Sequence, residues 1–368
     1  MNILLLANHL NVGGITSYIY SLACGLKAKG HSVYVAASTG DALPKFIDKG
    51  IVFIPLPLRT KSEISPKVWV SLTKLMPQVK ERKIDIIHAN TRVTQVLACF
   101  LQKLCGAPFV STCHGFFKMR FSRRVFPCWG QKVIAISQQV KDHLVNDFRI
   151  NEETIRIIHH GIDIDKYRVQ SIEYRAEAKN KLGLASGPVV GIVARLSDVK
   201  GHIYLIEAMK KVLLDIPEAQ LVIAGEGKMK DELVALSRRL GIGEKVFFIP
   251  TLADTLVVLS ALDLFVLPSL KEGLGLSLME AMACAICVIG SNVGGIKTLI
   301  RDGYNGLLVE PKDVNGLYLA ISGLLKDPAR MKALSDNARN FITGNFSLEQ
   351  MVSQTEGVYR ECLNLSLK

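Results

Sequence analysis

Short runs rich in Ile, Val and Leu alternate with longer amphipathic stretches along this chain, and the alternation occurs twice. Continuous apolar runs separated by helical segments are typical of parallel strands covered by helices on both faces. The strands predicted in the first half are Asn2–Ala7, Ser32–Ala36, Ile51–Ile54, Ile84–His88, Phe109–Thr112, Lys132–Ile136 and Ile155–Ile158. Those predicted in the second half are Pro188–Ala194, Ala219–Ala224, Lys245–Ile249, Leu262–Leu267, Val288–Gly290 and Gly306–Val309. The pattern predicts an α/β protein made of two Rossmann-like, doubly wound domains.

The length of 368 residues is comfortable for two domains, each with a core of its own. The polar segment 163–187 lacks strand character and is interpreted as the connection between them. We therefore expect a first domain over 1–165, completed by a C-terminal helix over 350–368, and a second domain over 166–349. Ligands of such domains bind outside the carboxyl ends of the strands, so two domains facing each other predict a site in the cleft between them.

The amino-acid composition favours a globular protein over a disordered, membrane-spanning or disulfide-rich one. Apolar residues make up 49% of the chain and charged residues 21%, with no low-complexity tract, which indicates a compact globular protein. The N-terminus lacks a basic region and is interpreted as a buried strand rather than a signal peptide, and no run is long enough to span a membrane, so we expect a cytoplasmic protein. The eight scattered cysteines do not resemble a disulfide framework, and Cys284 and Cys287 are interpreted as buried small residues rather than a metal or redox pair.

The net charge of +12 is concentrated in the first half. Residues 1–165 hold 21 Lys and Arg against 11 Asp and Glu, a balance of +10, and the remaining residues hold 24 against 22. No acidic residue occurs between Asp85 and Asp142, which favours anionic partners such as nucleic acid, lipid headgroups or phosphorylated substrates. A solvated basic surface is the alternative.

Three segments combine a strand end, glycines and the start of a helix. Gly13 and Gly14 follow the first strand, Arg195 and Lys200 follow the first strand of the second half, and Gly273 and Gly275 stand between Glu272 and Glu280. Two cations beside a helix N-terminus suit a diphosphate, and carboxylates suit sugar hydroxyls. The alternatives are a structural turn for the glycines, solvated surface charges for the cations, and glycoside hydrolysis for the paired carboxylates.

Taken in order, the motifs resemble glycosyltransferase family 4, the retaining GT-B enzymes. The resemblance is carried in the second half by "ARLSDVKG", "AGEG", "EGLGLSLMEAMAC" with its E-x7-E spacing, and "GSNVGGIKTLIRDGYNGLLVEPKD". In the first half it is carried by "NVGGITSYIYSLACGLKAKGHSVYV", "IDIIHAN", "TCHGFF", "IAISQQVKDHL" and "IRIIHHGIDIDKY". The resemblance covers nearly the whole chain and implies the GT-B architecture.

The resemblance also implies roles for individual residues in a retaining hexosyltransferase. Arg195 and Lys200 would neutralise the diphosphate of a nucleotide-sugar donor, Glu272 would hold hydroxyls of the transferred sugar, and Glu280 would hold the ribose. His114 would lie near the donor sugar. The implied catalytic residues are His114, Arg195, Lys200 and Glu272, and the implied donor-binding residues are Gly13, Gly14, Glu226, Gly273, Leu274, Gly275, Leu276 and Glu280.

No cofactor or metal ion is expected. Asp163 and Asp165 have the D-x-D spacing that other glycosyltransferases use for a divalent ion, but they occupy a segment that has no metal role in this family. The chain also departs from the family at Gly294-Gly295-Ile296-Lys297-Thr298, where a Pro-Glu pair is common after the two glycines. The missing acid puts donor-sugar contacts at this point in doubt.

The acid-free stretch predicts the acceptor side of the reaction. In "GFFKMRFSRRVFPCWG" aromatic residues are interleaved with Lys118, Arg120, Arg123 and Arg124, a mixture that suits an anionic membrane surface. We expect a peripheral enzyme at the inner face of the plasma membrane that acts on a lipid-linked glycan or a lipopolysaccharide or other cell-surface polysaccharide precursor. The alternatives are a loop packed on its own aromatics, a GT-B nucleotide-sugar epimerase, and a nucleic-acid-binding protein, for which no recognised module is present.

Overall fold

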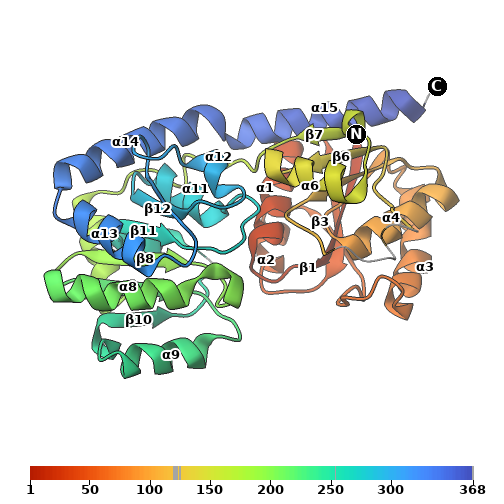
Figure 1. Ribbon diagram of the computed structural model, residues 1–368. Coiled ribbons are helices and arrows are strands. Elements are labelled where there is room, and N and C mark those ends of the chain that lie inside the picture. Colours follow the sequence, from red (N-terminus) through yellow and green to blue (C-terminus); the bar gives the residue numbers. More distant parts are fainter. Residues whose placement is uncertain (119–122, 124–125, 253, 367–368) are drawn as a thin grey trace. The chain divides into compact units, whose positions relative to one another are not determined.

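The computed structural model describes residues 1–118, 123, 126–252 and 254–366, and it consists of two compact units (Figure 1). The first unit combines Met1–Gly161 with Leu348–Lys368, and the second is Ile162–Ser347. The second unit is thus inserted into the sequence of the first. The division lies four residues before the boundary expected at residue 165.

The first unit is built on a seven-stranded parallel sheet with the order β3-β2-β1-β4-β5-β6-β7. Its strands are β1 (Asn2–His9), β2 (Ser32–Ser38), β3 (Val52–Pro55), β4 (Ile86–Ala89), β5 (Phe109–Cys113), β6 (Lys132–Ala135) and β7 (Ile155–Ile157). Each of them overlaps one predicted strand. The apolar runs are continuous because helices cover the sheet on both faces.

Among the described residues of this unit, two apolar clusters contribute to the core. On one face the sheet packs against α1 (Gly14–Ala28), α2 (Leu43–Asp48) and α15 (Leu348–Ser366). On the other face it packs against α3 (Pro66–Glu81) and α4 (Arg92–Cys105), while α6 (Gln138–Phe148) contacts β6 and β7. Side-chain hydroxyls cap the N-termini of α3, α4 and α6 by accepting from backbone amides of the first turn; they belong to Ser65, Thr91 and Ser137.

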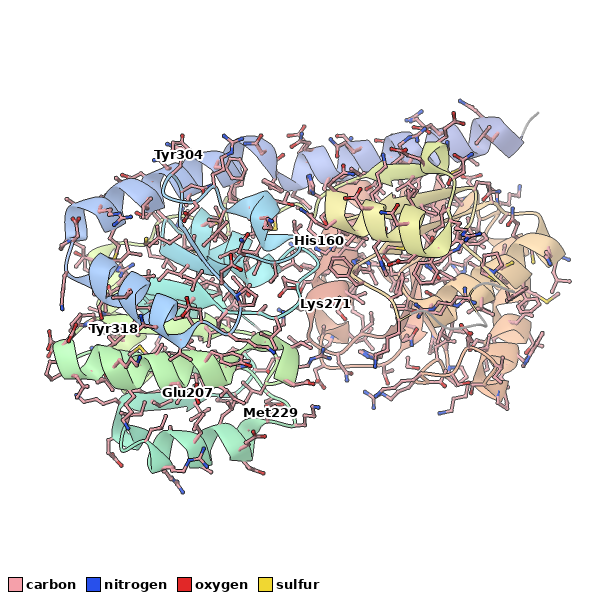
Figure 2. The ribbon with its side chains drawn as sticks, in the orientation of Figure 1. His160, Glu207, Met229, Lys271, Tyr304 and Tyr318 are labelled. Atoms are coloured by element: carbon pink, nitrogen blue, oxygen red, sulfur yellow. The ribbon has the colours of Figure 1, made fainter. Side chains whose placement is uncertain are left out.

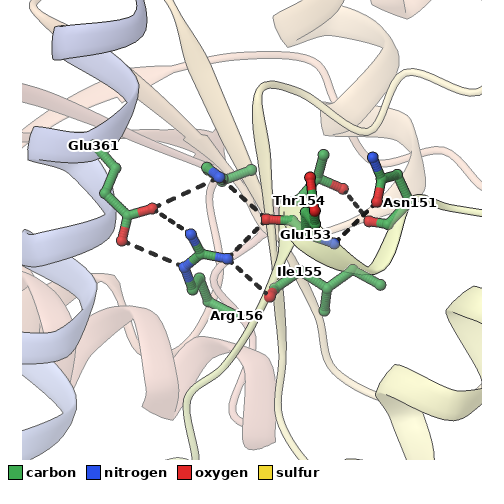
Figure 3. A network of polar contacts seen from close by, with 7 residues as sticks. Asn151, Glu153, Thr154, Ile155, Arg156 and Glu361 are labelled. Atoms are coloured by element: carbon green, nitrogen blue, oxygen red, sulfur yellow. Dashed lines mark hydrogen bonds and ion pairs between the residues drawn. The ribbon is translucent and has the colours of Figure 1, made fainter.

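The C-terminal helix α15 is bonded to the sheet of the first unit. Inside the core, the Tyr359 hydroxyl lies 2.6 Å from Nδ1 of His88 on β4. Nearer the surface, Arg156 Nη2 donates to Glu361 Oε2 over 2.7 Å, in a network that reaches Glu153 (Figure 3). Because Arg156 and Glu361 are both more than a third exposed, their ion pair contributes little, and the buried contact is the stronger attachment.

The second unit has a six-stranded parallel sheet with the order β10-β9-β8-β11-β12-β13. Its strands are β8 (Val189–Val193), β9 (Gln220–Ala224), β10 (Val246–Ile249), β11 (Leu264–Leu267), β12 (Cys287–Ser291) and β13 (Leu307–Val309). Its helices are α7 (Ile172–Lys181), α8 (His202–Asp215), α9 (Lys230–Arg239), α10 (Leu256–Ala261), α11 (Leu276–Ala283), α12 (Ile296–Leu299), α13 (Val314–Leu325) and α14 (Pro328–Asn345). All six predicted strands are present.

The interpretation of residues 163–187 as a connection is wrong. This segment belongs to the second unit and contains α7, which packs against α10. Arg175 and Lys179 of α7 bond to the carboxylate of Asp263 over 2.9 and 3.0 Å. The helix is polar and only Ala178 is buried, so its attachment by ion pairs leaves no apolar periodicity to find.

Each sheet has one point where the strand order reverses, between β1 and β4 in the first unit and between β8 and β11 in the second. Loops that follow the strands at such a point diverge and leave a crevice for ligands. Within the described residues, no helix is long and apolar enough to cross a membrane.

Candidate active site

The loops that follow β8 and β11 meet at the reversal point of the second sheet. Lys200, in the loop after β8, forms an ion pair with Glu272, in the loop after β11. Ser269 Oγ donates to Glu272 Oε2 over 3.3 Å, and the amide of Gly273 donates to Glu272 Oε1 over 3.3 Å. The Lys200 and Glu272 side chains are only 20% and 14% exposed. The structure therefore brings together two residues that lie 72 positions apart in the sequence.

Glycines let these loops touch through their backbones. Gly201 has φ 72°, and a Cβ atom there would lie 1.9 Å from the carbonyl oxygen of Pro268. A Cβ atom at Gly295 would lie 2.0 Å from the carbonyl oxygen of Gly273, and the Gly295 amide donates to the Glu272 carbonyl over 3.0 Å. Any side chain at either position would push the loop that holds Glu272 away. The Gly294-Gly295 pair thus positions Glu272, although the acid that often follows it in the family is absent.

Helix α11 begins beside this ion pair. Gly275, with φ 101°, is the N-cap residue, and the helix covers Leu276–Ala283, so the sequence feature of glycines at the start of a helix is present here. The first amides of a helix have no carbonyl partner within it and carry a partial positive charge. The Gly273–Leu276 turn consequently presents N–H groups near Lys200 and Glu272, a combination that suits an anion.

Glu280 is held by two hydroxyl groups. Its Oε1 accepts from the Tyr167 hydroxyl and its Oε2 accepts from Thr255 Oγ1, both over 3.0 Å. Burial raises the pKa of Glu280 above its ordinary value, because the two hydroxyl bonds only partly replace water. The sequence analysis assigned no role to Tyr167, the last residue of the "IRIIHHGIDIDKY" motif, or to Thr255, since they lie 113 and 25 positions from Glu280.

Arg195 and Glu226 are exposed on adjacent loops after β8 and β9. Their segments are joined by the hydrogen bond from the Leu196 amide to the Glu226 carbonyl, 2.9 Å long. Among the described residues, Arg195 has no hydrogen-bond or ion-pair partner. Its guanidinium therefore needs no rearrangement within this unit before it binds a ligand.

In the first unit, His114 follows β5 and lies in a cluster of buried polar side chains. His114 Nε2 lies 3.1 Å from Asn90 Oδ1, and His114 Nδ1 lies 3.1 Å from Nε2 of His160. His160 follows β7 and is labelled in Figure 2. The ring of Tyr18, on α1, packs against both imidazoles with centroid distances of 4.7 Å. The helix that begins at Gly14 thus also holds His114.

The histidines of this cluster are neutral. Burial, together with the neighbouring His160 and His88 rings, lowers the pKa of His114 well below its ordinary value. Burial lowers the pKa of His160, and also that of His88, to about 3. Uncharged imidazoles at this sheet edge act as hydrogen-bonding groups and not as cations.

Two family models match successive parts of the chain: that of Glycosyltransferase Family 4 matches residues 12–166, and that of Glycosyl transferases group 1 matches residues 175–341. The chain belongs to glycosyltransferase family 4. An uncharacterized glycosyltransferase of Methanocaldococcus jannaschii is 28% identical to this transferase over 96% of both chains. A UDP-Gal:α-D-GlcNAc-diphosphoundecaprenol α-1,3-galactosyltransferase of Escherichia coli is 28% identical over 86% of both.

The fold of the transferase is the GT-B fold. The crystal structure of Anabaena HepE in complex with UDP-glucose superposes with a TM-score of 0.88 at 23% identity, covering 98% of this chain and all of HepE. The two parallel sheets with their helices, predicted from the sequence, are confirmed by this likeness.

The basic segment of the transferase is only partly described, since Arg120 and Arg124 lie outside the described residues. Lys118 is exposed, and the Arg123 guanidinium lies 4.4 Å from the centroid of the Phe117 ring. Phe117 also packs against Trp129 and Phe148, and Trp129 is buried. Phe116 packs against His143, which in turn packs against Phe148. Arg123, Trp129, Phe148 and Arg149 line part of an open pocket beside these rings.

A different aromatic surface was missed by the sequence analysis. Trp69 on α3 is 51% exposed and packs at a tilt against Phe100 of α4, which in turn packs against Phe126. Lys103 lies 6.0 Å from the centroid of the Phe126 ring. Ile64, which precedes the N-cap residue Ser65 of α3, is 83% exposed. Trp69 precedes the acid-free stretch by many residues, so only the packing of α3 on α4 brings it to Phe100 and Phe126.

The Asp163–Asp165 segment shows a structural use for one of its carboxylates. Asp163 Oδ1 accepts from the Lys166 amide over 3.0 Å and so closes a turn. In the part of the chain that is described, no three His, Cys, Asp or Glu side chains gather as a possible metal site. Cys284 and Cys287 are both buried free thiols, as expected for small core residues.

Proposed function

We propose that this transferase moves a hexose, with retention of anomeric configuration, from a nucleotide-diphosphate sugar to a hydroxyl group of a lipid-linked glycan or a lipopolysaccharide or other cell-surface polysaccharide precursor. The observation that carries the proposal is the pairing of Lys200 with Glu272 beside the start of α11, at the reversal point of the second sheet. The E. coli relative, named for a diphosphoundecaprenol acceptor, and HepE, crystallised with UDP-glucose, support the classes of acceptor and donor.

The proposed chemistry follows from charge. As the bond between the sugar and the diphosphate breaks, negative charge grows on the diphosphate, and Arg195, Lys200 and the first amides of α11 stabilise it. In the free protein Lys200 is engaged with Glu272, so donor binding transfers the ammonium to phosphate oxygens and releases Glu272 to accept from sugar hydroxyls. Glu280 accepts from the ribose in place of one of its two hydroxyl donors, and Glu226 lies beside the same loops.

Retention in this scheme needs no protein nucleophile. The acceptor hydroxyl attacks from the side that the diphosphate leaves, and a phosphate oxygen takes its proton. His114 contacts the transferred sugar as a neutral group. Because cationic side chains and helix amides carry the leaving-group charge, we propose that the reaction needs no divalent ion.

We propose further that the first unit associates with the cytoplasmic face of an anionic membrane. Support comes from the half-exposed Trp69, the exposed Ile64 and the basic stretch around Lys103 and Lys118, since aromatic groups insert at an interface where cations meet headgroups. Sedimentation with vesicles that contain acidic lipids tests this. Loss of binding in Trp69→Ala, with the net charge unchanged, would support it, and no binding of the wild-type protein at low salt would refute it.

The activity is tested in two steps. A panel of nucleotide sugars is screened by thermal shift, because a ligand that binds only the native state raises Tm. The donors that bind are then incubated with a diphosphoundecaprenol-linked acceptor and the products are separated. Sugar transfer supports the proposal. Conversion of the nucleotide sugar to its epimer without any acceptor would show the epimerase alternative instead.

A further inference from the structure

We propose that His160 is a positioning residue: together with Asn90 it holds His114 in one neutral tautomer, with the proton on Nε2. The inference rests on the proposed function only for its effect on sugar transfer. The tautomer itself follows from the hydrogen bonds of the first unit.

The direction of each bond can be worked out from Asn90. Its Nδ2 lies 3.3 Å from the Leu6 carbonyl and 3.4 Å from the His88 carbonyl, both of which only accept. The amide nitrogen must therefore be on that side, and Oδ1 faces His114 as an acceptor. His114 Nε2, 3.1 Å from that oxygen, must carry a proton.

The same reasoning extends to His160. In a neutral His114 with a proton on Nε2, Nδ1 is a bare acceptor, so the contact of 3.1 Å to His160 Nε2 requires a proton on His160 Nε2. His160 Nδ1 is then a bare acceptor as well. That atom is buried and has no hydrogen-bond partner among the described residues, while the residue is only 5% exposed.

An unpartnered buried acceptor costs folding free energy, because it loses its hydrogen bonds to water and gains none in return. His160 carries this cost at Nδ1, while its Nε2 forms the hydrogen bond to His114. A purely structural side chain here would be expected to satisfy both nitrogens or to be apolar. The unsatisfied Nδ1 is explained if the function of His160 is to donate a hydrogen bond from Nε2 to His114 Nδ1.

The side chains around the pair are aromatic rings, hydroxyls, imidazoles and a thiol. Tyr18 of α1 packs on both rings, and its hydroxyl lies 3.3 Å from Thr112 Oγ1 on β5. His88 of β4 binds Thr112 and the Tyr359 hydroxyl of α15, whose Thr355 and Cys362 are also uncharged. His159, next to His160, binds the Ile136 carbonyl. The neighbouring imidazoles are therefore those of His88 and His159.

This geometry fixes how the pair titrates. His114 Nδ1 can be protonated only if His160 Nε2 no longer donates to it. His160 must then carry its proton on the buried Nδ1 instead of on Nε2. The two rings therefore titrate as a unit. Removal of the His160 donor frees His114 Nδ1 and should raise the pKa of His114.

Two variants separate positioning from packing. His160→Gln places an amide donor near the position of Nε2, whereas His160→Leu keeps the bulk and removes the donor. For His160→Leu we expect kcat to fall at least about tenfold with a smaller change in the donor KM, as is typical when a supporting hydrogen bond is lost. His160→Gln is expected to keep most of the wild-type kcat. Because Leu also removes the unpartnered Nδ1, Tm should change by less than about 4 °C.

The tautomer is read without any activity measurement. Proteins with ¹⁵N-labelled histidine are compared by long-range ¹H–¹⁵N correlation, and the His114 signals are assigned from their loss in His114→Gln. We expect a protonated Nε2 and a bare Nδ1 for His114 in the wild type, and a higher His114 pKa in His160→Leu.

Each outcome decides a different point. A proton on Nδ1 of wild-type His114 would overturn the inference, and so would equal kcat in wild type and His160→Leu. If kcat falls equally in both variants together with Tm, the role is structural and the inference fails. If no nucleotide sugar is turned over, the proposed function fails, and the NMR result still decides the tautomer.

Discussion

Gly201→Ala is the sharpest test of how the donor loops are held. Two costs arise from the structure. Alanine at φ 72° occupies the left-handed region, which costs roughly 1–2 kcal/mol. In addition, the new Cβ atom would start 1.9 Å from the carbonyl oxygen of Pro268, and relieving such overpacking costs about 1–3 kcal/mol more. The total expected loss in unfolding free energy is about 2–5 kcal/mol.

Gly183→Ala is the matched control. Gly183 lies in the same unit and has φ 67°, but a Cβ atom there meets nothing within 4 Å. The control should therefore show the backbone cost alone, about 1–2 kcal/mol. Since each kcal/mol lowers Tm by about 2–4 °C in a unit of this size, Gly201→Ala should melt about 2–12 °C below Gly183→Ala.

The two variants should also differ in turnover. Relief of the clash should move the loop after β8 away from the loop after β11 and separate Lys200 from Glu272, whereas Gly183 lies in the turn after α7, outside both loops. Calorimetry gives the two Tm values, and release of nucleotide from the donor gives turnover. Equal Tm and equal turnover for both variants would show that the close approach at Pro268 does not hold the site together.

Three further results are expected. Lys200→Ala should lower kcat about 100- to 1,000-fold, because it removes one group that stabilises the charge developing on the leaving diphosphate. Lys228, an exposed cation paired with Asp198, provides the control, and Lys228→Ala should leave kcat nearly unchanged. Similar losses of kcat in both variants would refute a specific role for Lys200. Because burial raises the pKa of Glu280, its contribution to stability falls as pH rises from the unfolded value through the folded one. Glu280→Gln should therefore raise Tm more at pH 8 than at pH 4 in thermal melts while weakening donor binding, and the opposite pH trend would contradict the assignment. Turnover should be unchanged by a chelator, and loss of activity that manganese restores would show a metal requirement.

The fold could be predicted to a large extent from the sequence. Every strand of both sheets overlaps a predicted apolar run, because strands buried on both faces must be apolar at successive positions. Helix α7 could not be recognised, because it is attached through Arg175, Lys179 and Asp263 and not through an apolar stripe. The periodicity of apolar residues indicates which face of an element is buried, so a helix attached mainly by ion pairs cannot be recognised from it.

The candidate site was predictable only where a strand end, a glycine and a charged residue stand together in the sequence. This applies to Lys200 and Glu272, whose ion pair the structure shows. The contacts of Tyr167 and Thr255 with Glu280 could not be predicted, because only the packing of separate elements brings these side chains together. His160 escaped for the same reason, since a histidine that follows a strand looks the same whether or not it bonds to another histidine across the sheet.

The order of the two units along the chain has a consequence for synthesis on the ribosome. Once residue 347 has been made, the inserted unit has all of its strands, while the earlier unit still lacks α15 and the Tyr359 hydroxyl that binds His88. The half that begins first is therefore completed last. A premature stop near the end of the gene, or a protease cut before Leu348, would damage the surroundings of His114 and leave the loops of Lys200 and Glu272 with their full sequence.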